Sequence, residues 1–348
     1  MKKLRIEVFF LTVLHMLVDG ICSTTIYASL YKDNIILPTI VFIGYNVLAF
    51  MMQPLVGFLV DTVKKERLLV LGSLFLVVTG SLLGSIPYLC LLFLGLGNAL
   101  FHVSAGKITI TNSNQKLSLL GVFVSLGVVG LTLGMLYYQF SSLLVILITL
   151  TILIGGCYYL IFHQKKEFLD ETQKKQSLNL SLTNIKIVMI VGVIIIVMFR
   201  GIIGKYTVFN WADEAYLVLL VAIATALGKL LGGVLADKIG ITKTILISGL
   251  GSLGFLLFAR DSIIGGLLGI LLFNMTMPIT LYLLYKMMPR YEATAFGLAA
   301  MILFPGYVIG MYLQEYPTRY NLIILIASLL TIIFVILFSK EVKKSEFY

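Results

Sequence analysis

The amino-acid sequence predicts an all-α membrane protein with twelve transmembrane helices in two similar halves, and three observations support this prediction. The chain of 348 residues is 59% hydrophobic and only 12% charged, whereas a soluble domain carries about 25% charged residues. Its apolar runs are about 20 residues long, the length at which a helix crosses a bilayer with its backbone hydrogen-bonded. Several residues also recur at one fixed spacing, which indicates an internal duplication.

The repeat has a spacing of 176 residues, so the repeated unit is half the protein. Gly57 and Asp61 recur as Gly233 and Asp237. Four more pairs keep the same spacing: Asn98 and Asn274, Gly121 and Gly297, Gly130 and Gly306, and Gly134 and Gly310. A chain with 31 glycines can match one such pair by chance. Six pairs that include an aspartate and an asparagine favour duplication.

The predicted helices follow the apolar runs, which short polar or proline-containing turns separate. In the first half they cover approximately residues 6–31, 35–60, 68–86, 88–110, 118–139 and 142–163. In the second half they cover approximately residues 185–204, 212–236, 241–259, 262–288, 291–313 and 320–339. The one long polar segment lies between these two sets. The predicted domains are therefore an N-terminal half at 1–163, a cytoplasmic central loop at 164–184 and a C-terminal half at 185–348.

The first apolar run follows a basic N-terminus, as in a signal peptide. The run continues past His15 and Asp19 to about Tyr31, which is too long for a signal peptide, so we predict an uncleaved helix. The chain has three cysteines, and all of them fall in apolar runs. We therefore expect no structural disulfide.

Lysine and arginine are unevenly distributed over the predicted loops. Twelve spans place both termini on one side, and that side then holds 20 of the 26 basic residues, against four on the other. Cytoplasmic loops are enriched in Lys and Arg. We therefore predict a multi-pass protein of the cell inner (plasma) membrane with both termini in the cytoplasm. The same bias explains the net charge of +10, so we expect no nucleic-acid partner.

Several ionisable and amide side chains fall inside the predicted spans. A charge at the bilayer centre costs about 2.5–3.5 kcal/mol, so each one is a candidate for a functional site. His15 and Asp19 are four residues apart and share one face of the first helix, as Asn98 and His102 do in the fourth. The further candidates for binding substrate or protons are Asn46, Arg200, Lys229 and Asn274.

These candidates come from both halves and can converge on a polar cavity near the bilayer midplane if the halves face each other. Asp19 and Arg200 are then natural partners across the cavity. The excess of positive groups favours an anionic or zwitterionic solute, and the histidines and Asp19 can exchange protons. In the alternative interpretation, Asn98 and Asn274 bond to a neighbouring helix, His102 bonds to a backbone carbonyl, and Arg200 extends to water.

The two stretches around Asp61 and Asp237 resemble the signature of the major facilitator superfamily, Gly-x-x-x-Asp-(basic)-x-Gly-(basic). The matching residues are Gly57, Asp61 and Lys65 in the first copy, and Gly233, Asp237, Lys238 and Gly240 in the second. Thr62, Lys64 and Ile241 depart from the pattern. The resemblance covers the whole chain and implies the major facilitator fold of two pseudo-symmetric six-helix halves. It also implies that both aspartates brace a cytoplasmic gate against the other half.

Within that superfamily, three segments are similar to fosmidomycin-resistance-type efflux proteins: residues 15–19, 53–57 and 97–102. The resemblance implies a secondary active transporter that moves a small organic solute by alternating access. Export of a drug or metabolite by proton antiport is the leading expectation. The fourth helix lacks the arginine that is common in proton-driven drug exporters. Residues 121–134 lack the Gly-Pro pair that is associated with antiporters. Uptake of a small anion or nutrient, coupled to protons or sodium, is therefore the alternative.

Other classes of function are less well supported by the sequence. Gly106 and Lys107 suggest a phosphate-binding loop, but Phe101 stands where that motif needs its first glycine. No nucleophile motif or metal-ligand spacing accompanies the histidines, so we expect no enzyme activity, catalytic residue, metal or cofactor. An ion gradient, with protons as the leading ion, should supply the energy. A membrane-embedded enzyme, a channel and a transport-inactive sensor remain alternatives. The expected partners are a small-molecule substrate and the lipid bilayer, and the expected state is a monomer.

Overall fold

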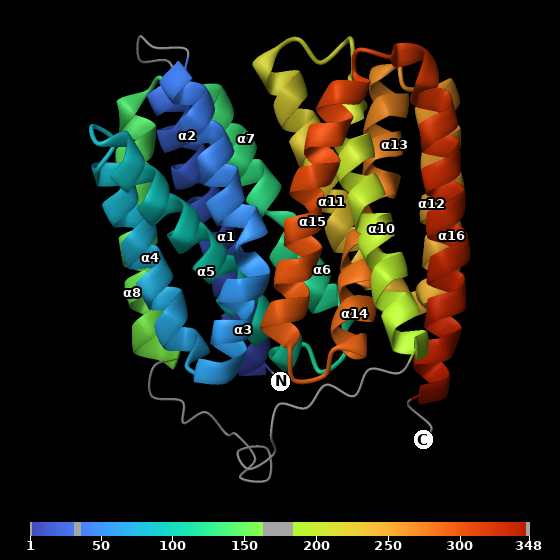
Figure 1. Ribbon diagram of the computed structural model, residues 1–348, viewed down its shortest axis with the longest axis horizontal. Coiled ribbons are helices and arrows are strands. Elements are labelled where there is room, and N and C mark those ends of the chain that lie inside the picture. The colour runs from blue at the N-terminus through green and yellow to red at the C-terminus, as the bar shows by residue number, and fades with distance from the viewer. Residues whose placement is uncertain (1, 31–35, 163–183, 346–348) are drawn as a thin grey trace.

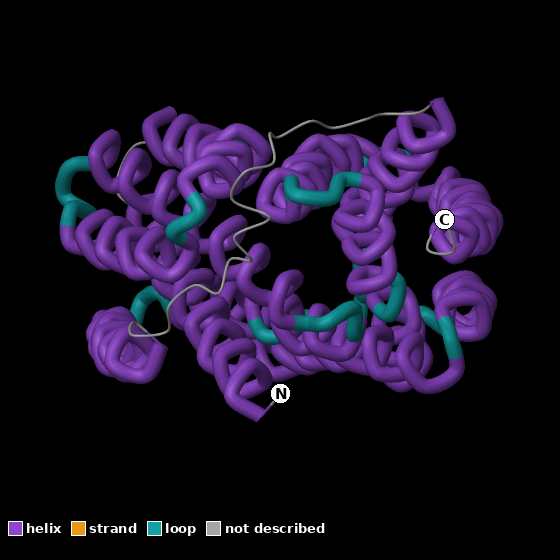
Figure 2. Tube along the Cα trace, turned by 90° about the horizontal axis from the view of Figure 1, so that it is seen from below, coloured by secondary structure: helices purple, strands orange, loops and turns teal. Residues whose placement is uncertain are grey.

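The computed structural model describes residues 2–30, 36–162 and 184–345, and this part of the chain contains helices, turns and short connections but no strand. The helices before residue 163 lie on one side of the molecule, and those after residue 183 lie on the other (Figure 1). Both chain ends lie at the lower end in this view. Seen along the helices, the molecule consists of two groups of helices that lie next to each other (Figure 2).

The described residues of the first side form eight α-helices and one π-helical turn. Their bounds are α1 Lys2–Leu30, α2 Ile36–Asn46, η1 Val47–Met51, α3 Gln53–Val63, α4 Glu66–Leu82, α5 Pro87–Asn112, α6 Leu117–Ser125, α7 Gly127–Tyr137 and α8 Ser141–Phe162. Residues 184–345, on the second side, form seven α-helices and one 3-10 turn. Their bounds are α10 Asn184–Tyr206, α11 Ala215–Ile239, α12 Ile241–Phe258, α13 Ile263–Asn274, α14 Met277–Met287, α15 Glu292–Leu313, η2 Pro317–Arg319 and α16 Tyr320–Ser345.

Eleven helical segments in the described ranges are long and apolar enough to cross a membrane. The twelfth predicted span is α4, whose 17 residues lie at the lower limit of about 17–25 residues for a spanning helix. The prediction of an all-helical, multi-pass membrane protein is therefore confirmed. The predicted central loop at 164–184 lies outside the described residues, apart from Asn184 at the start of α10.

Three of the predicted continuous helices are interrupted, and in this detail the prediction was wrong. The helix predicted at 35–60 breaks between η1 and α3, and the one predicted at 262–288 breaks between α13 and α14. Pro54 and Pro278 each lie in the first turn after the break, where a missing amide proton costs nothing. The third break, at Leu126 between α6 and α7, has no proline.

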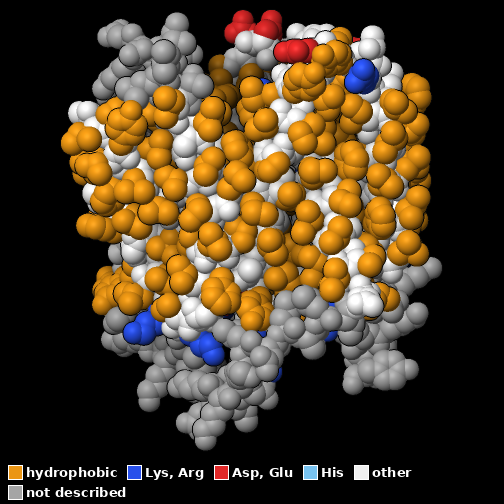
Figure 3. All heavy atoms as spheres, viewed as in Figure 1, with side chains coloured by type: hydrophobic (Ala, Val, Ile, Leu, Met, Phe, Trp, Pro, Cys, Tyr) orange, Lys and Arg blue, Asp and Glu red, His pale blue; other side chains and the backbone are white. Residues whose placement is uncertain are grey.

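The outer surface of the bundle is apolar over most of its height. Large hydrophobic side chains such as Phe75, Leu160 and Phe258 are 69%, 77% and 88% exposed. Figure 3 shows hydrophobic side chains over most of the height of one face, with basic side chains at both ends and acidic ones at the upper end. A surface of this kind is stable in contact with lipid rather than water.

Glycines allow the closest helix contacts on the first side. Gly130 and Gly134 of α7 face α1, and a Cβ atom on either would overlap the carbonyl oxygen of Met16 or Gly20. The backbones of α1 and α7 can therefore approach without intervening side chains.

The same contact recurs on the second side. Gly306 and Gly310 of α15 face the carbonyl oxygens of Met198 and Ile202 on α10. Gly228 and Gly232 of α11 likewise face the carbonyls of α13. The glycine pairs of the sequence repeat, 130/134 and 306/310, therefore occupy equivalent packing positions.

Substitution Gly130→Ala should lower the melting temperature of the purified protein in detergent. The added methyl group has no room against α1, and overpacking of this kind costs about 1–3 kcal/mol. Gly72→Ala is the matched control, because a Cβ on this helical glycine meets nothing within 4 Å, and alanine favours a helix over glycine. Equal melting temperatures for the two variants would contradict the packing described.

Candidate functional site

Asp61, at the end of α3, caps the N-terminus of α15 on the other side of the molecule. Its Oδ1 atom accepts a hydrogen bond from the Ala293 amide at 3.1 Å. Its Oδ2 atom accepts bonds from the amide and the hydroxyl of Thr294, at 2.9 and 2.8 Å. The first amides of a helix lack partners within the helix, and its dipole attracts a negative charge there. The buried carboxylate therefore joins two segments that are distant in sequence.

Lys107 of α5 provides the positive charge next to this cap. Its Nζ atom lies 3.1 Å from Asp61 Oδ1 and 2.8 Å from Glu66 Oε1. The side chain of Lys107 is buried. The long apolar run that contains Lys107 was the available signal for this burial.

Asp237, at the end of α11, makes the equivalent contact in the opposite direction. Its two carboxylate oxygens accept hydrogen bonds from the amides of Leu117 and Ser118, each at 2.9 Å. These two residues begin α6 and precede Ala293 and Thr294 by the spacing of the sequence repeat. The two aspartates therefore form a reciprocal pair of helix caps.

The glycines before the two aspartates allow this approach. A Cβ atom on Gly57 would lie 2.5 Å from the Ala293 carbonyl oxygen, and one on Gly233 would overlap the Leu117 carbonyl. Gly240 follows α11 with a φ of 86°, and Lys64 occupies the corresponding place after α3 with a φ of 55°. A left-handed conformation favours glycine. This preference gives a physical reason for the glycine of the signature. Lys64 departs from the signature, and its positive φ places the backbone there under strain.

The two basic residues that match the signature contribute less to holding the aspartates. The side chains of Lys65 and Lys238 are exposed. Lys107 and the helix N-termini are the positive groups that face the two aspartates in the described part of the chain.

A second group of polar residues lies inside the first bundle. The Asp19 carboxylate is 3.3 Å from His15 Nε2 on the same helix and 3.5 Å from His102 Nε2 on α5. Asn98, also on α5, donates a hydrogen bond from Nδ2 to Asp19 Oδ1 at 3.2 Å. The pairs predicted from their four-residue spacing therefore share helix faces, and the two faces meet.

Both histidine rings are held by backbone carbonyls. His15 Nδ1 lies 2.9 Å from the Phe123 carbonyl oxygen, and His102 Nδ1 lies 2.9 Å from the Asn98 carbonyl oxygen. Because a carbonyl can only accept, Nδ1 carries the hydrogen in each ring. Phe123 lies in the last turn of α6, where carbonyls lack partners within the helix. The break at Leu126 therefore contributes to positioning His15.

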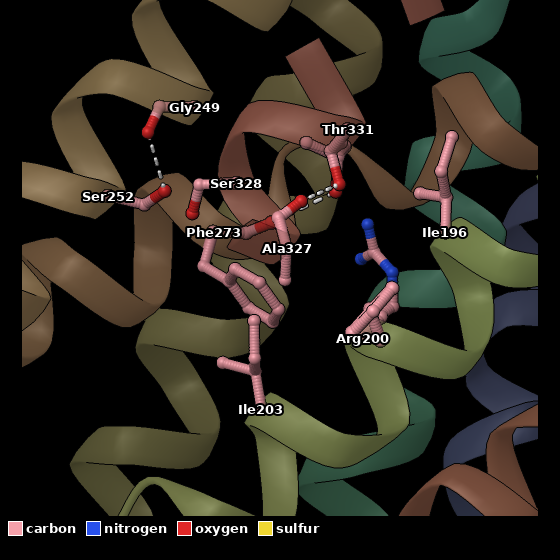
Figure 4. Close-up of a pocket in the computed structure, with 11 residues that line it drawn as sticks. Ile196, Arg200, Ile203, Gly249, Ser252, Phe273, Ala327, Ser328 and Thr331 are labelled. Atoms are coloured by element: carbon pink, nitrogen blue, oxygen red, sulfur yellow. Dashed lines mark hydrogen bonds between the residues drawn. The ribbon is translucent and has the colours of Figure 1, made fainter. Parts of the chain in front are cut away.

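Arg200 lies in the second bundle, apart from this cluster. Its side chain is buried, and its Nε and Nη1 atoms have no hydrogen-bond partner in the described part of the chain. In Figure 4 the guanidinium points from α10 towards Thr331 of α16, across a small cavity that Ser252 and Ser328 also line. The Phe273 ring lies beside it, with its centroid 5.6 Å from the guanidinium carbon. The predicted direct pair of Arg200 with Asp19 is not formed.

Lys229 of α11 is half-buried, and its charge is attracted by Asp19 and repelled by Arg200. The two remaining candidates have a different role. Asn46 and Asn274 donate to carbonyls of their own helices, at Phe42 and Ile270, each at 2.8 Å. The structure therefore brings His15, Asp19, Asn98 and His102 into direct contact and leaves Asn46 and Asn274 outside this cluster.

One buried ion pair was missed by the sequence analysis. Glu7 accepts hydrogen bonds from Arg67 Nε at 2.7 Å and from Arg67 Nη2 at 3.2 Å. Asn112 and Tyr158 also donate to its carboxylate. Glu7 lies at the start of the first predicted helix, next to the basic N-terminus.

The sequence matches no protein-family model and no curated protein sequence. The residues and their geometry therefore provide the support for a function.

Substitution Asp61→Ala should increase hydrogen–deuterium exchange at the amides of residues 293–294 by roughly tenfold or more, because charge-assisted hydrogen bonds are lost. Asp237→Ala should instead increase exchange at residues 117–118. The measurement is mass spectrometry of peptides from the two helix starts, and each variant is the control for the other. Unchanged exchange at both starts would contradict the caps.

Proposed function

We propose that this protein is a secondary active transporter with the major facilitator fold. Residues 1–163 form one six-helix half and residues 185–348 the other. The halves rock against each other, so that a central site is open alternately to the two sides of the membrane. The substrate is a small organic solute, and an ion gradient supplies the energy.

The reciprocal helix caps are the observation that carries this proposal. Asp61 joins the end of α3 to the start of α15, and Asp237 joins the end of α11 to the start of α6. Both contacts lie at the end of the bundle that holds the chain termini (Figure 1). Each cap consists of a few directional bonds that can break together. Contacts of this type are suited to a gate that closes one end of a transport pathway in one state and opens in another.

The buried polar groups support a central binding site. His15, Asp19 and His102 come from the first half, whereas Arg200 and Lys229 come from the second. Charges within membrane spans are costly and are retained where they bind a solute or an ion. We assign ion coupling to the cluster around Asp19, with protons as the ion that the sequence favours. Export is the direction that the family resemblance favours.

A specific observation favours a second candidate, the uptake or export of a small anion. The Nε and Nη1 atoms of Arg200 are buried without partners, and an unsatisfied buried group costs about 1–3 kcal/mol or more when charged. A carboxylate or phosphonate group on the substrate would accept a charge-assisted hydrogen bond from one of these nitrogens. Lys229 would add a second positive charge near the same anion.

Expression of the protein in cells that lack their own efflux pumps should protect them from one or more toxic compounds. The panel should include phosphonate antibiotics and cationic dyes, with growth and intracellular accumulation as measurements. Asp19→Asn and Asp61→Asn should abolish protection because they remove the coupling and gating carboxylates. Asp261→Asn is the control, because this side chain is 81% exposed.

Protection by the wild type and the control alone would support export, whereas sensitisation would support uptake. Equal growth and accumulation of every compound, with the protein present in the membrane, would contradict export of these classes.

Substitution Arg200→Gln should selectively impair transport of anionic substrates. Loss of a charge-assisted hydrogen bond of about 1.5–3 kcal/mol should raise the half-saturating concentration by about 10–100-fold. Transport of cationic compounds should be unchanged. Arg260→Gln is the matched control, since Arg260 lies over Tyr320 outside the cavity. Equal losses for anions and cations would contradict anion recognition by Arg200.

A further inference from the structure

We propose that His15, Asp19 and His102 form a binding site for a divalent transition-metal ion. The inference goes beyond the transport function, because it concerns binding alone. The sequence analysis predicted no metal, since these residues lie on two helices and lack a recognisable ligand spacing. The structure places one ligand atom from each of them within 4.8 Å of the others.

The orientation of the histidine rings is the first argument. Each Nδ1 donates its hydrogen to a backbone carbonyl, so each neutral ring directs the lone pair of Nε2 towards Asp19. Two nitrogen lone pairs and a carboxylate therefore face one another at 3.3 and 3.5 Å. Such an arrangement is repulsive unless a positive species lies between them. Carbonyl partners on Nδ1 are also the usual outer contacts of metal-bound histidines.

The distances are the second argument. In a tetrahedral site with metal–ligand bonds of 2.0–2.1 Å, neighbouring ligand atoms lie about 3.3 Å apart. His15 Nε2 lies 3.3 Å from Asp19 Oδ2, and His102 Nε2 lies 3.5 Å from Asp19 Oδ1, so each histidine is at this spacing from a different oxygen of the carboxylate. The third separation needs only a small movement, since all three atoms already lie within 4.8 Å.

The surroundings are already arranged to hold these ligands. Asn98 Nδ2 donates to Asp19 Oδ1 and orients the carboxylate. The Asn98 Oδ1 atom is buried without a hydrogen-bond partner in the described part of the chain, so it can accept a bond from a metal-bound water. The His15 and His102 rings pack edge to face, with centroids 4.6 Å apart.

Gly127 has no side chain, and this leaves room for the neighbouring ligand atoms. A Cβ atom on this residue would overlap His15 Nε2 and lie 2.5 Å from Asp19 Oδ2. The first residue of α7 therefore has to be small for the two head groups to keep their positions. The Asp19 side chain retains 13% of its exposure, which leaves the cluster accessible to an ion.

The ligand set selects the class of metal. Two imidazoles and one carboxylate suit ions such as Zn²⁺, Co²⁺ and Fe²⁺, whereas Mg²⁺ and Ca²⁺ prefer oxygen ligands. Three protein ligands leave at least one position for water or for a donor group of a solute. Lys229 opposes the added charge, because it interacts with Asp19 and His102. The site should therefore bind more tightly when Lys229 is neutral.

The first test is a titration of the purified full-length protein with Co²⁺ in detergent, followed by visible absorption. The expected result is saturable binding of one Co²⁺ per chain, with the intense bands of a four- or five-coordinate site, and no competition by Mg²⁺. His15→Ala and His102→Ala should each weaken binding by more than the roughly 10–100-fold that loss of an outer partner costs. His163→Ala is the control and should bind as the wild type does.

Three further variants should change the affinity for Co²⁺ by different amounts. Asn98→Ala should weaken Co²⁺ binding by about 10–100-fold, and Gly127→Ala should weaken it by crowding. Lys229→Met should bind Co²⁺ at least as tightly as the wild type. Absence of saturable binding, or binding that survives loss of both histidines, would overturn the proposal.

A measurement on the wild type alone covers the case in which the histidine variants do not fold. X-ray absorption of the Zn²⁺-loaded protein should show two imidazole ligands, and an all-oxygen shell would overturn the site. These experiments need no flux, so their failure would leave the transport proposal standing.

Discussion

The structure depends on a buried carboxylate at the start of a helix. A helix N-terminus offers unpartnered amides and a partial positive charge, and neither can be satisfied by lipid. Asp61 meets this need for α15, and Asp237 meets it for α6. Asp61 is buried, and the α15 amides and Lys107 together compensate its charge, whereas Asp237 makes its cap at an exposed position. Carboxylate and helix end therefore depend on each other across the boundary between the two bundles.

The charged groups deeper in the bundles have different kinds of neighbours. Asp19 has three polar neighbours from its own side of the molecule, two histidines and Asn98. Arg200 has an aromatic ring beside it and two nitrogens without a hydrogen-bond partner in the described residues. The two sides therefore hold charges of opposite sign in different surroundings, although their backbone contacts repeat.

The sequence predicted the helices well because lipid exposure requires long apolar runs, and these are visible without a structure. It also predicted that His15 shares a face with Asp19, since a four-residue spacing is a local property of a helix. The break at Leu126 could not be predicted, because no proline marks it. The burial of Lys107 and the separation of Arg200 from Asp19 likewise depend on how helices pack, which composition does not determine.

The reciprocal caps differ in the order in which a ribosome makes their parts. Asp61 is synthesised 232 residues before its partner amide at Ala293, so the new carboxylate enters the membrane long before α15 exists. Lys107 follows much sooner and can hold the charge during that interval. Asp237 is synthesised after Leu117, so the start of α6 has already been made when Asp237 is added to the chain. The first aspartate therefore needs a temporary counter-ion during biosynthesis, and the ion pair with Lys107 provides one.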